Sequence, residues 1–504
     1  MKHIIGLDIG TTSTKAVLFD ESGKILETAN EGYPLYEDEV DMAEQDPQEI
    51  LEAVIEVLYK LVYKSEIEAK SIRGVSISAA MHSLILVDDD MQPLTRSITW
   101  ADNRAAKYSA ELKQTEIGQQ IYEKTGTPIH PMAPLSKLIW LRNEKPKLFA
   151  KTKYFIGIKE YILYRLFGEL KTDYSIASTT GLFNIFDLTW DAQALETAGI
   201  ATEQLPEPVP ITYQMRGLKP QYVEETGLSA SITFVMGGSD GALSNLGVNA
   251  VSQGTLALTI GTSGAVRTVV NKPVTDPKGR LFCYVLDEGR WLVGGPVNNG
   301  GIIFNWVKEQ IFNDEISFEE LNKIITEIPA GAEGLLFLPY LGGERAPLWD
   351  ADARGTFFGM TRTHNRNHLA RAALEGINFN LNNVVKALEE TTGEVKTIQA
   401  TGGFARSELW KQMLADIFDK DINIPESFES SCLGAAVIAM KSLNMIDDLD
   451  EVHKMLGVTD SYKPNPENVA KYQKLFKIYT NLDGVLKDEY SVIADYQRQN
   501  QEGK

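Results

Sequence analysis

Two segments of this chain, roughly 250 residues apart, share one pattern: an apolar strand, a short turn of Gly, Thr and Ser, and a second apolar strand. They run from Ile4 to Asp20 and from Leu256 to Val270. A turn of this composition presents backbone N–H groups to a phosphate. The duplication therefore predicts two related halves that face each other across a cleft, each supplying one turn to the same polyphosphate, as in an ATP-dependent enzyme.

The coarse pattern alternates strands with helices, which predicts an α/β fold. One helix is expected to begin after Asp46, which is followed by a proline and then by an apolar face. A longer helix is expected from Asn367 to Leu388. The 504 residues exceed a single core. We expect two domains, 1–248 and 249–504, with the boundary just before the second phosphate turn.

Composition excludes several classes of partner. The formal net charge of −20 argues against nucleic acid and anionic lipid, because binding to either needs clustered Lys and Arg. Only a few apolar residues precede Asp8, so the N-terminus is expected to be a first strand rather than a signal peptide or a membrane span. Cys283 and Cys432 lie far apart and outside metal-like spacing, as expected of a reduced, cytoplasmic chain.

The first turn combines an acid with phosphate donors. Asp8 ends an apolar strand, Gly10 lets the backbone bend, and Lys15 lies nearby as a cation. Hydroxyl groups come from Thr11, Thr12 and Ser13. A carboxylate among phosphate donors is repulsive unless a metal intervenes, so Asp8 is the candidate ligand for Mg²⁺. The alternative is a plain β-hairpin with a polar turn.

A third turn of small residues follows a short β run at Gly402 and Gly403, and a helix is expected to begin at Ser407 or Glu408. Paired glycines permit the close approach of a purine or its ribose. The alternative is a strand-to-helix turn whose glycines relieve packing. Neither GxxxxGK[ST] nor GxGxxG occurs, which disfavours P-loop and Rossmann nucleotide sites.

Transfer of a phosphoryl group to an alcohol needs a base near the hydroxyl. Asp240 is the candidate, because it follows an apolar strand between glycines and no Lys or Arg neighbours it in the sequence. The alternative is a turn aspartate that caps the next helix.

Long segments of the chain resemble the FGGY family of carbohydrate kinases, which belongs to the actin/hexokinase-type ATPases. Residues 132–144 (MAPLSKLIWLRNE) and 355–375 (GTFFGMTRTHNRNHLARAALE) resemble the two diagnostic segments of that family, and EQDP, GERAPLWD and ATGGFARS match further landmarks. The resemblance implies two ribonuclease H-like domains flanking a central cleft. It also implies a phosphotransferase that uses ATP and Mg²⁺.

Roles of individual residues follow from the same resemblance. It implies that Asp240 is the catalytic base and that Asp8 holds Mg²⁺. The residues implied to hold the phosphates are Thr11, Thr12, Ser13 and Lys15 from one lobe and Gly261 and Thr262 from the other. The residues implied to line the nucleotide are Gly301, Gly403 and Ser407, with Gly402 and Arg406 adjacent. Those implied to contact the sugar are Met81, His82, Trp100, Asp102 and Arg104, together with Asp240.

Within the family, stretches such as AMHS, ITWADNR and GGPVNNGG are similar to those of bacterial gluconate kinases. Gluconate is an open-chain sugar acid, and its carboxylate needs a cationic or amide donor. The candidate donors are Arg104, His82, His130 and Asn299. Xylulose kinases share the Met-His pair and the W-x-D-x-R segment, so xylulose or another polyol is the alternative substrate. The expected partners are a sugar or sugar acid and MgATP, with a homodimer as a possible assembly.

A protein of another class remains as an alternative. The same superfold serves nucleotide-driven proteins that do not phosphorylate sugars, such as actin-like filament subunits and sugar-sensing regulators. No basic helix-turn-helix is appended to the chain, and the Met81-His82 pair favours a sugar site. Sugar-dependent turnover of ATP distinguishes a kinase from either of these.

Overall fold

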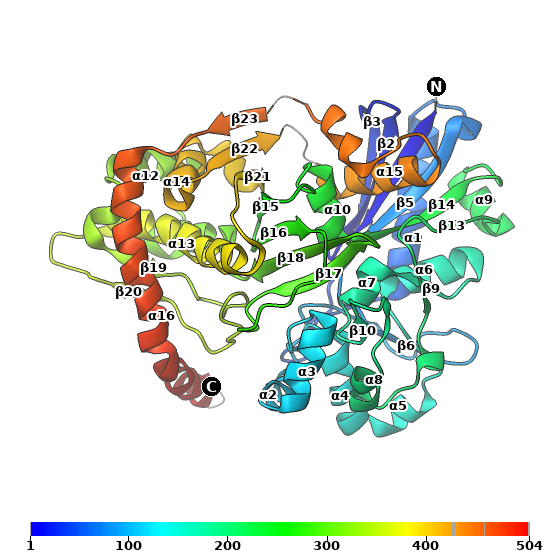
Figure 1. Ribbon diagram of the computed structural model, residues 1–504, viewed down its shortest axis with the longest axis horizontal. Helices are drawn as coiled ribbons and strands as arrows, with labels where there is room; N and C mark the ends of the chain where they lie inside the picture. Colours follow the sequence, from blue (N-terminus) through cyan, green and yellow to red (C-terminus); the bar gives the residue numbers. More distant parts are fainter. Residues whose placement is uncertain (1, 426–428, 458, 502–504) are drawn as a thin grey trace. The chain divides into compact units, whose positions relative to one another are not determined.

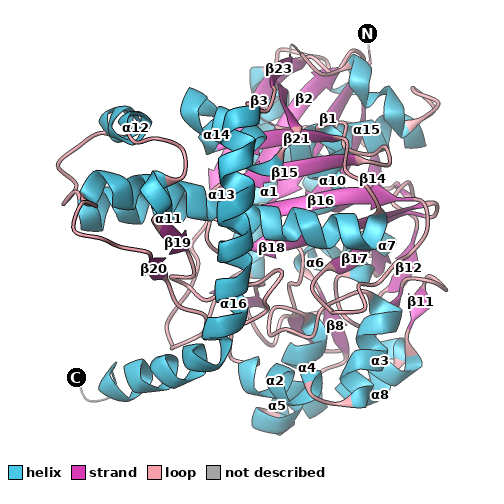
Figure 2. Cartoon of the chain, turned by 60° about the vertical axis from the view of Figure 1, so that its left-hand side comes forward, coloured by secondary structure: helices cyan, strands magenta, loops and turns pink. Residues whose placement is uncertain are grey.

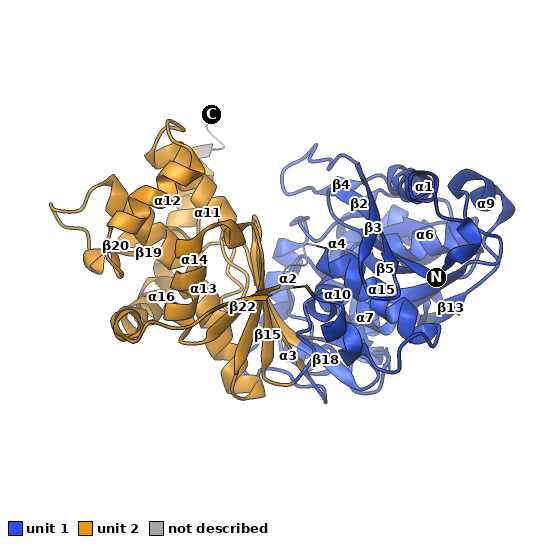
Figure 3. Cartoon of the chain, turned by 90° about the horizontal axis from the view of Figure 1, so that it is seen from above, with its two compact units in different colours: residues 1–252, 270–292, 429–456 blue, residues 253–269, 293–428, 457–504 orange. Residues whose placement is uncertain are grey.

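The computed structural model describes residues 2–425, 429–457 and 459–501 (Figure 1). The chain forms two compact units, each assembled from three segments (Figure 3). Unit 1 comprises Met1–Ser252, Val270–Leu292 and Glu429–Leu456, and unit 2 comprises Gln253–Val269, Val293–Phe428 and Gly457–Lys504. A segment from the C-terminal half of the sequence therefore belongs to unit 1. The domain boundary expected after residue 248 stays a prediction.

Unit 1 contains a six-stranded sheet in the order β13-β14-β5-β1-β2-β3. The first three strands, β1 (His3–Ile9), β2 (Ser13–Asp20) and β3 (Ile25–Gly32), form an antiparallel meander. On the other side of β1, β5 (Ile72–Ala79) and β14 (Thr233–Ser239) continue the sheet in parallel, and β13 (Gln214–Met215) is antiparallel to β14. The first predicted hairpin is thus confirmed as β1-β2.

Helices pack against this sheet through apolar faces. The helix expected after Asp46 is α1 (Pro47–Lys64), whose first turn is capped by the Asp46 carboxylate accepting from the Gln48 N–H. It packs against β2 and β3. Burial of each large apolar side chain on such a face stabilises the fold by about 1.5–3 kcal/mol. The buried face of α1 includes Ile50, Leu51, Val54, Val57, Leu58 and Leu61.

Glycines allow two further helices of unit 1 to pack unusually closely. Helix α15 (Ser430–Ser442) packs against β1, β5 and α10 (Asp240–Gly247). A Cβ at Gly6 would lie 1.9 Å from the carbonyl oxygen of Cys432, and a Cβ at Gly434 would lie 2.0 Å from that of Leu243. Neither contact is compatible with a side chain, so these glycines explain how a segment so late in the sequence joins unit 1.

A second apolar core in unit 1 includes residues of helices α2 (Ala106–Lys113), α3 (Glu116–Thr125), α4 (Pro134–Glu144) and α8 (Ala192–Ala198). The other elements of this unit are β4 (Glu44–Gln45), β6 (Ile85–Val87), β7 (Ser97–Ile98), α5 (Pro146–Lys151), β8 (Tyr154–Ile156), α6 (Ile158–Phe167), β9 (Lys171–Asp173), α7 (Tyr174–Ser178), β10 (Phe183–Asn184), β11 (Thr189–Trp190), β12 (Glu207–Val209), α9 (Pro220–Thr226) and β17 (Phe282–Asp287). Strand β18 (Arg290–Val297) leads into unit 2.

Unit 2 repeats the central topology of unit 1. Strands β15 (Thr255–Ile260) and β16 (Gly264–Val270) form the second predicted hairpin, and β21 (Thr397–Gly402) and β22 (Asp421–Pro425) follow β15 in parallel. The order β16-β15-β21-β22 corresponds to β2-β1-β5-β14. Strand β23 (Thr459–Tyr462) adds to β22 in antiparallel orientation. The duplication predicted from the two hairpins is therefore present in the fold.

The helices of unit 2 include α11 (Gly301–Trp306), α12 (Phe318–Glu327), α13 (Arg366–Thr392), α14 (Glu408–Phe418) and α16 (Pro466–Gln501). Helix α13 contains the long helix predicted from Asn367, and α14 packs against both α13 and α16 (Figure 2). The short strands β19 (Leu336–Leu338) and β20 (Thr356–Phe358) pair in antiparallel orientation. Among the described helices, none has the length and hydropathy needed to cross a membrane.

Candidate active site

Asp8 lies near the end of β1, in register with Ser78 on β5. The Ser78 hydroxyl donates a 2.6 Å hydrogen bond to Asp8 Oδ1. Burial raises the pKa of Asp8 to about 7, the Ser78 hydrogen bond opposes this rise, and the negative charge of Asp240 adds to it. Asp8 and Asp240, singled out separately in the sequence, thus interact electrostatically within unit 1.

Asp240 is the first residue of α10, immediately after β14, and Ser239 occupies the N-cap position without a capping hydrogen bond from its side chain. The pairing of β14 with β5 shifts register between Val235 and Gly238. At Gly237, with φ of 69°, a Cβ would lie 2.1 Å from the Ile77 carbonyl oxygen. This bulge requires glycine, and it sets the direction in which the chain leaves the strand toward Asp240.

Buried polar groups support the junction before Asp240. The Ser239 N–H donates to Ser175 Oγ at 3.1 Å. A fully buried ion pair joins Lys159 Nζ to Asp173 Oδ2 at 2.6 Å, and the same ammonium donates to the Gly238 carbonyl oxygen at 3.4 Å. The Asp240 carboxylate itself accepts from the Gly241 N–H at 2.7 Å. These hydrogen bonds and this ion pair hold the backbone at Asp240 in place.

The first predicted phosphate turn is held on both sides by side chains from distant segments. Trp100 Nε1 donates to Thr11 Oγ1 at 2.9 Å, and Gln45 Nε2 donates to the Thr11 carbonyl oxygen at 2.5 Å. Thr12 is exposed at the tip of the turn, and Ser13 begins β2. The Lys15 ammonium forms an ion pair with Glu429 at 3.0 Å. Lys15 therefore already has a carboxylate partner in unit 1.

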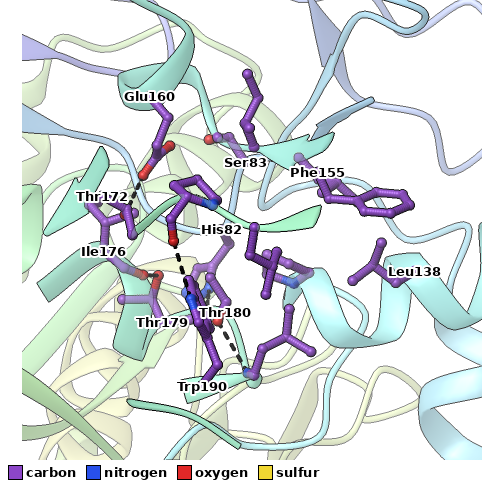
Figure 4. Close-up of a pocket in the computed structure, with 17 residues that line it drawn as sticks. His82, Ser83, Leu138, Phe155, Glu160, Thr172, Ile176, Thr179, Thr180 and Trp190 are labelled. Atoms are coloured by element: carbon purple, nitrogen blue, oxygen red, sulfur yellow. Dashed lines mark hydrogen bonds between the residues drawn. The ribbon is translucent and has the colours of Figure 1, made fainter. Parts of the chain in front are cut away.

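The predicted sugar-side residues lie in two segments of unit 1. His82 is buried with φ of 67°, and its Nδ1 is 2.8 Å from the Thr179 carbonyl oxygen (Figure 4). It lines a small cavity of about 30 Å³, and Glu160 lies in the same lining. Met81, which precedes His82, is partly buried.

Asp102 and Arg104 form the second sugar-side segment with Trp100. The Asp102 carboxylate is fully buried and accepts from the Ala43 N–H at 3.0 Å. The Arg104 guanidinium pairs with Asp102 at 2.7 Å and with Glu44 at 2.5 Å. Two carboxylates therefore neutralise Arg104, which weakens its candidacy as the cation that receives a substrate carboxylate.

Unit 2 contains a cavity of about 410 Å³ that brings together most of the predicted nucleotide residues. Its lining includes Gly261, Thr262, Gly301, Gly403, Arg406 and Ser407. The Gly301 N–H donates to the Gly261 carbonyl oxygen at 2.7 Å, and a Cβ at Gly301 would lie 2.7 Å from the same oxygen. No atom lies within 4 Å of a Cβ built at Gly403, so this glycine leaves open space in the cavity wall.

Gly402 is the predicted nucleotide residue that is absent from this lining. Its φ is 124°, and a Cβ there would lie 2.1 Å from the Ile260 carbonyl oxygen on β15. Gly402 therefore serves close packing of β21 against β15, and Gly403 faces the cavity. Ser407 caps α14 by accepting from the Trp410 N–H at 3.2 Å, and its hydroxyl donates to Asn322 Oδ1 at 2.9 Å. This agrees with the predicted start of that helix.

Sequence reasoning missed the aromatic wall of the cavity. Phe304 lies between Phe318, with ring centroids 5.6 Å apart, and Trp410, with centroids 5.5 Å apart, and Phe404 also lines the space. Flat apolar rings beside polar glycine turns suit a purine base and its phosphates. These rings come from α11, α12, the segment after β21 and α14, and no local pattern marks them as neighbours.

Glu344 is another residue that the pattern did not single out, although it lies within GERAPLWD. Its buried carboxylate accepts from the N–H groups of Asn298 and Arg345 and from the side-chain amides of Asn299 and Asn380. Asn298 and Asn299 directly precede the glycines that open α11. Glu344 therefore holds the turn that leads to Gly301 in the cavity wall.

Comparison with known proteins gives matches along nearly the whole chain. Residues 3–247 match the N-terminal domain model of the FGGY family of carbohydrate kinases, and residues 256–443 match its C-terminal domain model. The gluconokinase of Bacillus subtilis (strain 168) is 47% identical, with 98% of each chain covered.

Two solved structures from Lactobacillus acidophilus have the same fold. A gluconate kinase matches with a TM-score of 0.95 and 43% identity, covering 98% of this chain and 99% of that one. A ligand-bound xylulose kinase matches with a TM-score of 0.95 and 44% identity, covering 98% and 100%. The two domain models and these full-length similarities agree with the repeated sheet topology, and the chain belongs to the FGGY family of carbohydrate kinases.

Proposed function

We propose that the chain transfers the terminal phosphoryl group of MgATP to a hydroxyl of D-gluconate, giving 6-phosphogluconate, with Asp240 as the general base. The observation that carries this proposal is the placement of Asp8 and Asp240 in unit 1, after parallel strands of one sheet, where the charge of Asp240 adds to the rise in the pKa of Asp8. A kinase needs a base beside the alcohol and a carboxylate near the metal-bound phosphates. Asp8 lies near the end of β1 and Asp240 directly follows β14, and these two strands run parallel on either side of β5 in one sheet.

The residues around Asp8 fit a magnesium ion. Asp8 offers carboxylate oxygens, and Mg²⁺ takes one or two carboxylates together with water and phosphate oxygens. Within residues 2–425, 429–457 and 459–501, no group of three or more His, Cys, Asp and Glu side chains could hold a metal ion. When bound, the ion would offset negative charge on the phosphate oxygens.

In this mechanism the Asp240 carboxylate accepts the proton of the substrate hydroxyl as that oxygen attacks the terminal phosphorus, and the bond from this phosphorus to the bridging oxygen breaks, so that ADP leaves. The Gly241 N–H orients the carboxylate through its hydrogen bond to Oδ1. Thr11, Thr12, Ser13 and Lys15 are proposed to hold the phosphates from unit 1. Gly261, Thr262, Gly301, Gly403, Arg406 and Ser407 are proposed to hold the nucleotide from unit 2.

The proposal of gluconate as the substrate is supported by the 47% identity to a gluconokinase. Xylulose is the second candidate, because a ligand-bound xylulose kinase is 44% identical to this chain. An ADP-release assay with gluconate, xylulose, glycerol and ribulose separates them. The highest kcat/KM with gluconate supports the proposal. Phosphorylation of xylulose with gluconate ignored would overturn the substrate and leave the kinase intact.

The role of Asp240 has its own test. We expect Asp240→Asn to lower kcat by about 10²–10⁴-fold, the usual contribution of a general base, while nucleotide binding is kept. The matched control is Asp89→Asn, because the Asp89 side chain in the same unit is 88% exposed. Product assays at fixed time points measure kcat, and calorimetric titration with ATP measures nucleotide binding. Undiminished turnover in Asp240→Asn would remove Asp240 from this role.

A further inference from the structure

Helix α4, which carries the segment MAPLSKLIWLRNE, contains a lysine that is fully buried. The Lys137 ammonium lies 2.6 Å from the carbonyl oxygen of His82, 2.7 Å from that of Thr99 and 3.3 Å from that of Ile98. An ammonium has three N–H donors, and here they meet three backbone acceptors. A buried lysine whose donors all go to backbone carbonyls serves to hold those backbone segments in place.

The segments it joins are the two predicted sugar-side segments. His82 belongs to one of them, and its left-handed backbone is strained for a residue with a side chain. Thr99 directly precedes Trp100, whose indole bonds to Thr11 in the first phosphate turn. Lys137 therefore links the Met81-His82 segment to the segment of Trp100, Asp102 and Arg104.

A second residue of α4, one turn further on, contacts the same region. The guanidinium of Arg104 lies over the ring of Trp140, 4.5 Å from its centroid. Residues three apart share one face of a helix, so Lys137 and Trp140 present an ammonium and an aromatic ring to the sugar-side segments together. The helix thus contacts both segments.

We propose that Lys137 is a positioning residue for the sugar site, whose ammonium fixes the His82 and Thr99 backbones relative to each other. The inference rests on the proposed function, since it assigns those two segments to the sugar. A buried apolar replacement removes the one donor that these carbonyls share, although the Ile98 carbonyl keeps the Leu84 N–H at 3.0 Å and the Thr99 carbonyl keeps the Asp102 N–H at 3.2 Å. The strained His82 backbone then relaxes and the segments shift, and a displacement of about 1 Å can cost up to 10²-fold in rate.

The experiment compares Lys137→Met with Leu141→Ala in the full chain. Leu141 is buried one turn away on the same helix, so its truncation also loosens α4 without removing the ammonium. We expect Lys137→Met to raise the KM for gluconate about tenfold or more and to leave the KM for ATP within about twofold. Leu141→Ala should lower the thermal midpoint similarly and leave both KM values within about twofold.

Lys137→Gln is the second variant, because its shorter neutral amide can still donate to one carbonyl and is easier to accommodate if Lys137→Met does not fold. It should raise the gluconate KM less than Lys137→Met does. A gluconate KM unchanged in every folded Lys137 variant would overturn the inference. So would equal rises of both KM values, or the same rise in Leu141→Ala. If the wild type phosphorylates xylulose and not gluconate, the proposed substrate fails, and the same split is measured with xylulose.

Discussion

Replacement of Glu344 by glutamine tests how the proposed nucleotide site is held together. Glu344 Oε1 accepts from the N–H groups of Asn298 at 2.5 Å and Arg345 at 2.8 Å. Its Oε2 accepts from the side-chain amides of Asn299 at 2.9 Å and Asn380 at 2.7 Å. In glutamine one of these oxygens becomes an NH₂ group, which faces two donors and can accept from neither.

The expected cost follows from that loss. Each hydrogen bond to a charged group contributes about 1.5–3 kcal/mol, so losing two costs roughly 3–6 kcal/mol. Burial raises the pKa of Glu344, which means that the buried charge itself is unfavourable. Glutamine removes that penalty, and we expect a net destabilisation of about 2–4 kcal/mol. For a unit of about 200 residues this corresponds to a fall of roughly 5–15 °C in the unfolding midpoint.

Differential scanning calorimetry measures this fall, and steady-state kinetics measure its functional consequence. Because Glu344 holds the turn before Gly301, the KM for ATP should rise severalfold and exceed any rise in the KM for the sugar. Glu319→Gln is the matched control, since the Glu319 side chain is 82% exposed and pairs only with Lys323 on its own helix in the described contacts. A Glu344→Gln protein with the stability and ATP affinity of the control would refute this reasoning.

Two further predictions concern stability. The folded pKa of Asp8 is about 7 and its ordinary value is 3.8, so the folded chain keeps a proton that the unfolded chain releases, and Asp8 stabilises the fold less as pH rises toward 7. Asp8→Asn should be inactive in the MgATP assay. In Mg²⁺-free buffer it should be more stable than the wild type at pH 8, by roughly 2 kcal/mol after allowance for partial exposure. This advantage should disappear near pH 4; urea unfolding at both pH values measures it, and a gap independent of pH contradicts the assignment. Gly434→Ala places a Cβ 2.0 Å from the Leu243 carbonyl oxygen and should destabilise unit 1 by about 3 kcal/mol or more. Its control, Gly484→Ala in α16, meets no atom within 4 Å and should be neutral or stabilising by about 0.5–1 kcal/mol; equal thermal shifts in the two variants would be inconsistent with this account of α15.

Local patterns in the sequence were sufficient for the elements that carry the site. Apolar runs around Gly-Thr-Ser turns predicted both hairpins, the spacing of apolar residues predicted α13, and Ser407 predicted the start of α14. The position of Asp240 at a strand-to-helix junction was also readable. Each of these features depends on residues within a few positions of one another. Short-range backbone preferences of this kind can be read directly from the sequence.

Tertiary structure decided which of these elements meet. Ser78 reaches Asp8 across 70 positions, and Lys137 reaches the carbonyl of His82 across 55. The aromatic lining of the cavity in unit 2 comes from several separate segments of that unit. These contacts arise from strand register and from glycine-permitted close packing between distant segments. Neither leaves a periodic signal in the sequence, because periodicity reports which face of an element is buried and not which partner covers it.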